Sequence, residues 1–158
     1  MFKTTAAALL AATAVMVGGA SAHAQVTAEQ VVLAETVTID AEGREQVTTA
    51  PAQKVVPGDR LAYVLRYANE GDAPASDLVM VMPVPAKVAL VPGSETGDAP
   101  EHSADGGATY GAPGTLTVTD ADGERPAGPS DITHIRWRLA GNLAPGATGE
   151  VGYRATLR

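Results

Sequence analysis

Three acidic side chains gather in one short stretch of the sequence, Asp120, Asp122 and Glu124, with Gly123 among them. Carboxylates at alternate positions, with a glycine that lets the backbone turn, are typical of a calcium-binding loop. The pattern is incomplete, because a third oxygen ligand ahead of the glycine and the distal glutamate are both missing. An Asp-Gly pair is also a favourable hairpin turn by itself. Two interpretations follow: a calcium site at these three residues, or a plain turn.

Histidine, cysteine and serine offer little further chemistry. Beyond the N-terminal segment the sequence has two histidines, His102 and His134, and neither has another histidine nearby. A zinc site needs three or four ligands at set spacing, and the sequence contains no cysteine. The Gly-x-Ser-x-Gly turn that presents a serine nucleophile is absent as well. We therefore expect a protein that is not an enzyme, with no cofactor other than calcium.

The elements that must position these residues are β-strands. Over residues 60–68 apolar side chains alternate with polar or small ones, which is the period of a half-buried strand. The alternation returns over residues 132–139, where we expect Trp137 at the centre of the core, and over residues 150–158. Arginines lie on the polar faces of the last two strands. They predict either a basic stripe or, more simply, cross-strand ion pairs.

Shorter β-rich runs complete the pattern at residues 78–82, 87–91 and 115–119. The sequence contains 17 glycines and 11 prolines, which suits frequent turns between short strands. No helical period of useful length appears after the N-terminal segment. The sequence thus predicts an all-β protein, an antiparallel β-sandwich of about seven to nine short strands.

Two segments leave alternatives open. Residues 25–46 contain a predicted strand, which is either half of a hairpin within the sandwich or a detachable strand that pairs with a neighbouring molecule. Residues 94–114 are rich in Gly, Ala and acidic residues, so we expect a long, exposed and mobile loop. That loop is either a variable insertion or a binding loop.

Several separated motifs resemble one known family. They are VVPGDRLAYVLRYANEGDAPASDL at residues 55–78, KVALVPGS at residues 87–94 and ITHIRWRLAGNLAPGATGEVGYRATLR at residues 132–158. In this order they are similar to the conserved-repeat family known as domain of unknown function eleven, and the resemblance covers roughly residues 47–158. It implies an immunoglobulin-like β-sandwich of bacterial surface and secreted proteins, and it implies no enzyme activity.

The first 24 residues have the pattern of a secretory signal peptide. Lys3 precedes an apolar run over residues 6–17, a Gly-Gly pair breaks the run, and Ala22-His23-Ala24 forms a small-x-small cleavage site. A retained membrane anchor is the alternative. We expect an exported protein that is periplasmic, at the cell surface or extracellular, and that has no membrane segment after cleavage.

Composition and charge narrow the expected function. The formal net charge of −7 opposes binding to nucleic acid, which depends on Lys and Arg that neutralise phosphates. We expect residues 1–24 to be the signal peptide, 25–46 an N-terminal extension and 47–158 the sandwich domain. The predicted function is a structural or protein-interaction module that binds a protein partner, or itself, through its β-edges and the 94–114 loop. The alternative is a module that binds a small ligand or glycan, assisted by calcium.

Overall fold

The structure is a computed structural model that describes residues 23–158 of the chain. Within that range the regular secondary structure consists of ten strands. They are β1 (Val26–Ile39), β2 (Glu45–Pro51), β3 (Arg60–Asn69), β4 (Val79–Pro83), β5 (Val88–Leu90), β6 (Glu101–Ser103), β7 (Thr117–Asp120), β8 (Gly123–Pro126), β9 (His134–Arg138) and β10 (Thr148–Leu157). The described residues include no helix long and apolar enough to cross a membrane. The all-β prediction is confirmed, whereas residues 1–22 of the predicted signal peptide lie outside the described part.

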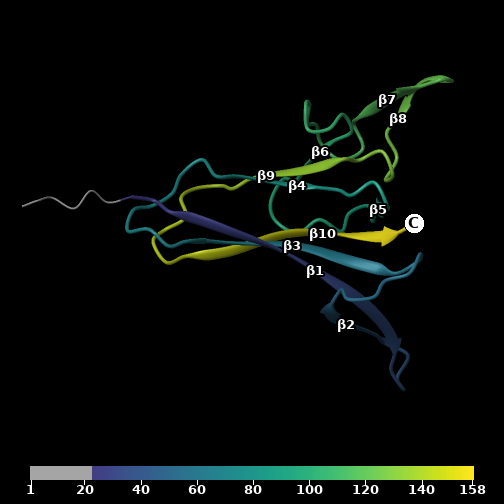
Figure 1. Cartoon of the computed structure of the whole chain (residues 1–158), viewed down its shortest axis with the longest axis horizontal. Coiled ribbons are helices and arrows are strands. Elements are labelled where there is room, and N and C mark those ends of the chain that lie inside the picture. The colour runs from purple at the N-terminus through teal and green to yellow at the C-terminus, as the bar shows by residue number, and fades with distance from the viewer. Residues whose placement is uncertain (1–22) are drawn as a thin grey trace, which may run out of the picture.

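The strands form three antiparallel sheets. The largest has the order β2-β1-β3-β10-β5, the second has the order β4-β9-β6, and β7 pairs with β8 alone. Figure 1 shows β4 and β9 in one layer and β1, β3 and β10 in another. The structure has ten strands where the sequence predicts seven to nine, because β6 lies in a segment with the composition of a loop and β8 begins within the predicted turn at residues 120–124.

One hydrophobic core lies between the two larger sheets. The predicted alternation on β3 and β9 is confirmed, and Trp137 and Ile135 are fully buried. The tyrosine rings of Tyr63 and Tyr153 stack with their centroids 4.9 Å apart, and the Tyr153 hydroxyl donates to the Pro83 carbonyl at 2.7 Å. That hydrogen bond joins β10 to β4, so it fixes one sheet against the other. The buried apolar members of this core from β3, β4, β9 and β10 are Leu61, Tyr63, Met80, Met82, Ile135, Trp137, Val151, Tyr153 and Ala155.

A buried asparagine fastens the start of β1 to the rest of the sheet. The Asn69 side chain donates to the carbonyls of Ala73 and Leu143 at 2.7 and 2.9 Å. Its carbonyl oxygen accepts from the backbone N–H groups of Gln25 and Gly71 at 3.2 and 3.1 Å. All of the hydrogen-bonding capacity of this fully buried side chain is therefore used. Beyond this point β1 pairs with β3 without interruption from Val26 to Glu35.

The prediction of an exposed, mobile loop over residues 94–114 is wrong for its central part. Residues Glu101–Ser103 form β6 and pair with β9. Ser103 is fully buried, and the His102 ring nitrogen Nε2 lies 2.6 Å from Oε1 of Glu95, with both side chains buried. Gly97, at φ 96°, lies against the core, since a Cβ there would meet Val151 at 2.8 Å. Composition misled the prediction because this segment is buried through paired polar groups and a glycine, not through apolar side chains.

Candidate functional site

The three predicted calcium ligands lie on the β7–β8 hairpin and serve that hairpin. Asp120 Oδ2 accepts from Arg125 Nε at 2.7 Å, and its Oδ1 accepts from the Asp122 backbone N–H at 3.0 Å. Glu124 Oε1 accepts from the Thr117 hydroxyl at 2.7 Å. Within residues 23–158 no group of three or more acidic, histidine or cysteine side chains is placed to hold a metal ion. Calcium binding at Asp120, Asp122 and Glu124 stays a prediction that the sequence alone supports.

The arginines on the polar strand faces form cross-strand ion pairs, not a basic stripe. Arg136 and Arg138 on β9 donate to Glu101 on β6 at 2.8 and 3.3 Å. The hydrogen bond from Arg136 holds the pKa of the Glu101 carboxyl below its usual range. Arg154 lies on β10 in the other sheet, where it pairs with Glu35 on β1. Because β9 and β10 belong to different sheets, the stripe cannot form.

The two larger sheets have four edges, and two of these are closed by neighbouring loops. At the β5 edge the Leu90 N–H donates to the Pro129 carbonyl at 3.2 Å. At the β6 edge His102 and Gly111 exchange two backbone hydrogen bonds of 2.8 and 2.9 Å. Both closures satisfy main-chain groups that would otherwise be available to another chain. The remaining edges are β2 in the five-stranded sheet and β4 in the three-stranded sheet.

The β2 edge is the longer of these two, and all seven of its residues are exposed. At one end of the β1–β2 ladder the Ala52 N–H donates to the Val32 carbonyl, and at the other end the Asp40 N–H donates to the Arg44 carbonyl. These two bonds show that the backbone groups of the even-numbered residues of β2 point toward β1. Backbone groups alternate in direction along a strand. The N–H and C=O groups of Glu45, Val47 and Thr49 therefore point away from the sheet.

The β4 edge offers less backbone. The Val84 N–H donates to the Thr133 carbonyl at 2.8 Å, so the even-numbered residues of β4 direct their backbone groups toward β9. Only Val79 and Val81 therefore direct both an N–H and a C=O away from the sheet. Pro83 follows and has no N–H to donate. The side chains of Val79 and Val81 are 45% and 44% exposed. This edge is therefore a shorter, more apolar surface than β2.

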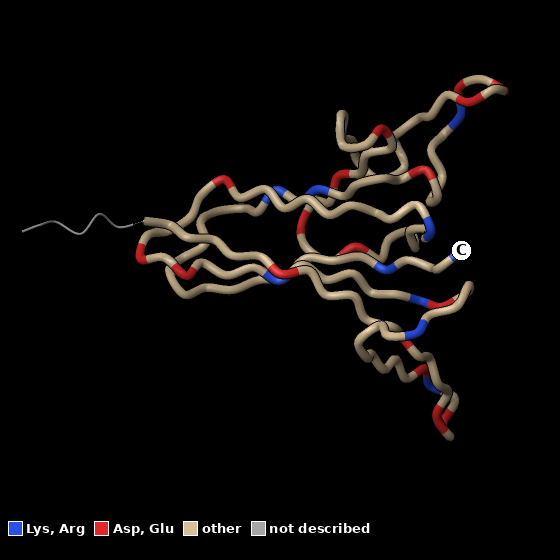
Figure 2. The backbone as a smooth tube through the Cα atoms, in the orientation of Figure 1, with Lys and Arg blue, Asp and Glu red and all other residues tan. Residues whose placement is uncertain are grey.

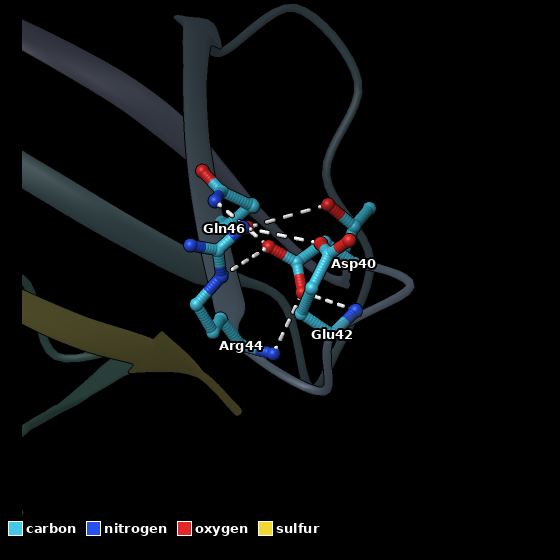
Figure 3. A network of polar contacts seen from close by, with 5 residues as sticks. Asp40, Glu42, Arg44 and Gln46 are labelled. Atoms are coloured by element: carbon cyan, nitrogen blue, oxygen red, sulfur yellow. Dashed lines mark hydrogen bonds and ion pairs between the residues drawn. The ribbon is translucent and has the colours of Figure 1, made fainter.

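The outer half of the β1–β2 hairpin projects beyond the sheet. β3 begins at Arg60, which pairs with Glu35, so β1 has no partner on that side after Glu35. We call residues 36–48 the β1–β2 arm. Its tip is a polar network around Asp40 (Figure 3), which accepts from the backbone N–H and the Nε of Arg44 at 2.8 and 2.9 Å and from Gln46 Nε2 at 3.3 Å. The Arg44 backbone N–H is the main reason that the pKa of Asp40 is lowered.

An ion pair between a buried glutamate and a half-exposed arginine fixes the base of the arm. The Glu35 side chain is only 3% exposed, and its Oε1 accepts from Arg154 Nε at 2.6 Å across the outer face of the sheet. Two adjoining hollows of about 370 and 200 Å³ share Glu35, Ser94 and Arg154 as lining residues. Sequence reasoning missed Glu35. The available signal was a lone carboxylate within the apolar run VVLAETVTI.

The comparisons with known proteins leave this chain without an assigned relative. No family model matches it, and neither a curated protein nor a solved structure matches it. The resemblance to the conserved-repeat family therefore stays a prediction from the motifs. The candidate site is an open sheet edge, β2, continued by the projecting β1–β2 arm.

Proposed function

We propose that this chain is a non-enzymatic protein-interaction module, exported to the cell envelope, with an immunoglobulin-like β-sandwich fold. Its contact surface is the free edge of β2, where a strand of a partner protein adds to the five-stranded sheet. The two packed antiparallel sheets and the family resemblance support the fold assignment. The signal-peptide pattern of residues 1–24 supports export.

The observation that carries the proposal is the unprotected state of β2. Natural edge strands are usually short, charged along their length, bulged or covered. β2 has seven exposed residues, a regular ladder to β1, and only one charged residue, Glu45, at its start. Such an edge suits strand addition, in which main-chain hydrogen bonds supply affinity and alternate side chains supply specificity.

The pairing of β1 decides how a partner would approach. β1 forms ten consecutive pairs with β3 of its own chain and seven with β2. Of the two interpretations of residues 25–46, this arrangement corresponds to the hairpin within the sandwich. A partner strand therefore adds outside β2 and does not replace β1. The partly buried 94–114 segment is left out of the proposed contact surface.

A crosslinking experiment tests this proposal. Because the chain has no cysteine, a single Thr49→Cys change can carry a photoreactive group at the β2 edge. We expect a crosslinked product of defined mass in envelope fractions, and we expect Val47→Pro to remove it. Val47→Pro deletes an outward N–H but no hydrogen bond to β1. The matched control is the same group at Thr117 on the β7–β8 hairpin, which should give no such product. Absence of a product at Thr49, or a product indifferent to Val47→Pro, would contradict the proposal.

A second candidate function is the binding of a small ligand or glycan in the hollows beside Glu35. One observation favours it: Arg154 binds Glu35 through Nε alone and its side chain is 49% exposed. Its remaining N–H groups can therefore donate to a ligand carboxylate or hydroxyl. Thermal unfolding of the chain with glucuronate is the test. Stabilisation that disappears in Arg154→Met would support this function, and no stabilisation would exclude that probe.

A further inference from the structure

We propose that the partner strand at the β2 edge is β2 of a second copy of this chain, paired antiparallel about a twofold axis that passes beside Val47. This inference rests on the proposed function and names its partner. The observations behind it are the direction of the backbone groups on β2, the exposed apolar residues of the arm and the distribution of charge along the strand.

The backbone of β2 limits the registers that two copies can adopt. Only Glu45, Val47 and Thr49 direct both an N–H and a C=O outward, and Pro51 directs a carbonyl alone. With Val47 opposite Val47 of the second copy, Glu45 lies opposite Thr49, and every N–H and C=O of these three residues finds a partner, while the Pro51 carbonyl stays unpaired. If the axis moves by one residue to Thr48, Glu45 lies opposite Pro51, so the Pro51 carbonyl is paired and the Glu45 carbonyl is left without a donor. The two registers form the same number of hydrogen bonds, so the side chains decide between them.

The side chains favour the register centred on Val47. Val47 is 50% exposed and pairs with Val37 on β1, so both point to the outer face of the sheet. In the proposed dimer the two Val47 side chains meet, and a row of four valines crosses the axis from one β1 to the other. Ile39, 63% exposed, lies on the same face one row away. Self-pairing thus covers apolar groups whose exposure on an otherwise polar arm has no explanation within one chain.

Charge is compatible with self-pairing. In this register the cross-strand neighbours are Val with Val, Glu45 with Thr49 and Gln46 with Thr48. No like charges face each other, which is the arrangement that would oppose pairing. The geometry of the arm also allows it. Figure 1 shows the arm leaving the body of the molecule, so antiparallel pairing of two arms places the two bodies at opposite ends of a shared ribbon.

Disulfide formation between engineered cysteines tests the register directly. In the full chain, Val47→Cys should form a disulfide-linked dimer under mild oxidation, because facing residues lie within disulfide distance. Thr49→Cys alone should not, whereas Glu45→Cys combined with Thr49→Cys should. Efficient linkage through Thr48→Cys, in place of Val47→Cys, would overturn the register.

Light scattering coupled to size-exclusion chromatography then tests the dimer without crosslinks. Val47→Pro removes the two hydrogen bonds donated by the two Val47 N–H groups, so we expect the dimer dissociation constant to rise about thirtyfold. Thr49→Lys places a lysine opposite Glu45 and should tighten the dimer about threefold, whereas Val47→Lys places two lysines face to face and should weaken it about threefold. A chain that stays monomeric at millimolar concentration would overturn the inference, as would a dimer unaffected by Val47→Pro.

The proposed interaction module and the proposed self-pairing of β2 can be disproved separately. If the wild-type chain is monomeric and the Thr49 crosslinker captures a protein of another mass in a Val47-dependent way, self-pairing is wrong and the interaction module stands. If the Thr49 crosslinker captures neither a second copy nor another protein, both proposals are wrong. A captured product of twice the chain mass, with the cysteine pattern above, supports both.

Discussion

Two hairpins of this protein share a run of Thr-Val-Thr and an Asp-Ala-acid-Gly turn, yet they are held in different ways. The β1–β2 arm contains TVTIDAEGRE at residues 36–45, and the β7–β8 hairpin contains TVTDADGER at residues 117–125. In both, the aspartate Oδ1 accepts from the backbone N–H two residues on, at 3.1 and 3.0 Å. In both, Oδ2 accepts from an arginine Nε, at 2.9 and 2.7 Å. Figures 1 and 2 show both hairpins projecting at the end of the molecule where the C-terminus lies, each with charged residues near its far end.

The difference lies in what each arginine reaches beyond its own turn. Arg125 also binds Asp131 through both Nη atoms at 2.7 and 3.0 Å, which ties the β7–β8 hairpin to the segment before β9. Arg44 binds only Asp40 and Glu42, both within the arm. The arm is instead held at its base by the pair of the buried Glu35 side chain with Arg154. A short sequence can therefore determine a hairpin, but a distant partner determines how the hairpin is attached.

The repeated turn also bears on the acidic run that predicted calcium. Asp40-Ala41-Glu42-Gly43 and Asp120-Ala121-Asp122-Gly123 share one pattern, and both form a turn with the glycine at positive φ, 79° and 115°. The run is thus sufficiently explained by turn formation in two places. The aspartate closes the turn, and the glycine adopts a conformation that other residues rarely adopt.

The largest effect is expected at the base of the arm. Arg154→Met leaves the Glu35 carboxylate, 3% exposed, without its partner, and should lower the free energy of unfolding by about 2 kcal/mol, a value reduced for the exposure of Arg154. Glu35→Gln should cost about half as much, because it leaves a guanidinium that water can solvate. Urea unfolding measures both. The control is Arg66→Met, whose pair with Glu150 is exposed at 3.6 Å and should matter least. A larger loss in Glu35→Gln than in Arg154→Met would contradict this account.

The stability lost when a turn glycine is replaced by alanine should depend on the backbone φ of that glycine. Gly123→Ala and Gly43→Ala each place a Cβ at positive φ and should cost about 1 kcal/mol of local hairpin stability, with the larger cost at Gly123 because its φ of 115° is farther from the left-handed helical region. Amide hydrogen exchange within each hairpin measures the change. Exchange in β3 and β10 serves as the internal control and should stay unchanged. Equal protection of the mutated and wild-type hairpins would show that the turns do not need glycine.

The pH responses of the two tips should differ in their cause. Hydrogen bonds from Arg125, and then from the Gly128 N–H, lower the pKa of Asp131 to about 2, and Arg125 is also the main cause of the lowered pKa of Asp120. The stabilisation from Asp131 is complete above its unfolded pKa near 4 and is lost as the pH falls toward about 2. We expect Arg125→Gln to raise the pKa of both aspartates in an NMR titration.

The same titration on the arm provides the contrast. The largest contribution to the lowered pKa of Asp40 is a backbone N–H, which Arg44→Gln retains. The pKa of Asp40 should therefore change less in Arg44→Gln than the pKa of Asp120 changes in Arg125→Gln. Changes of equal size at the two tips would mean that both turns depend on their arginine side chains.

The smallest effect is expected for Arg44→Gln on overall stability. Its side chain is 69% exposed, and exposed ion pairs contribute little. We expect no measurable shift of the urea midpoint, whereas Arg125→Gln should accelerate amide exchange in β7 and β8. A midpoint shift in Arg44→Gln as large as that of Arg154→Met would place the anchor of the arm at its tip and not at its base.

Much of the strand content was predictable because it is local. Alternation over residues 60–68 and 132–139 predicted β3 and β9, with Trp137 in the core, and each of these expectations is confirmed. The β1–β2 hairpin follows from turn residues between β-rich runs, whereas at the β7–β8 hairpin the sequence predicted the first strand and the turn but not the return strand β8. The candidate site was only half predictable. A strand near residue 31 was expected, but the arm, its open β2 edge and the role of Glu35 were not.

What the sequence determined by itself is most of the strands, their buried faces and the turns between neighbours, because side-chain alternation and positive-φ glycines act within a few residues. The tertiary structure alone decided the strands β6 and β8, the order β2-β1-β3-β10-β5, the burial of His102 and Ser103 in a segment that resembles a loop, and the different attachments of two hairpins with similar turns. Those features depend on partners such as Glu35 and Arg154, which lie 119 positions apart and satisfy each other only after the sheet has formed.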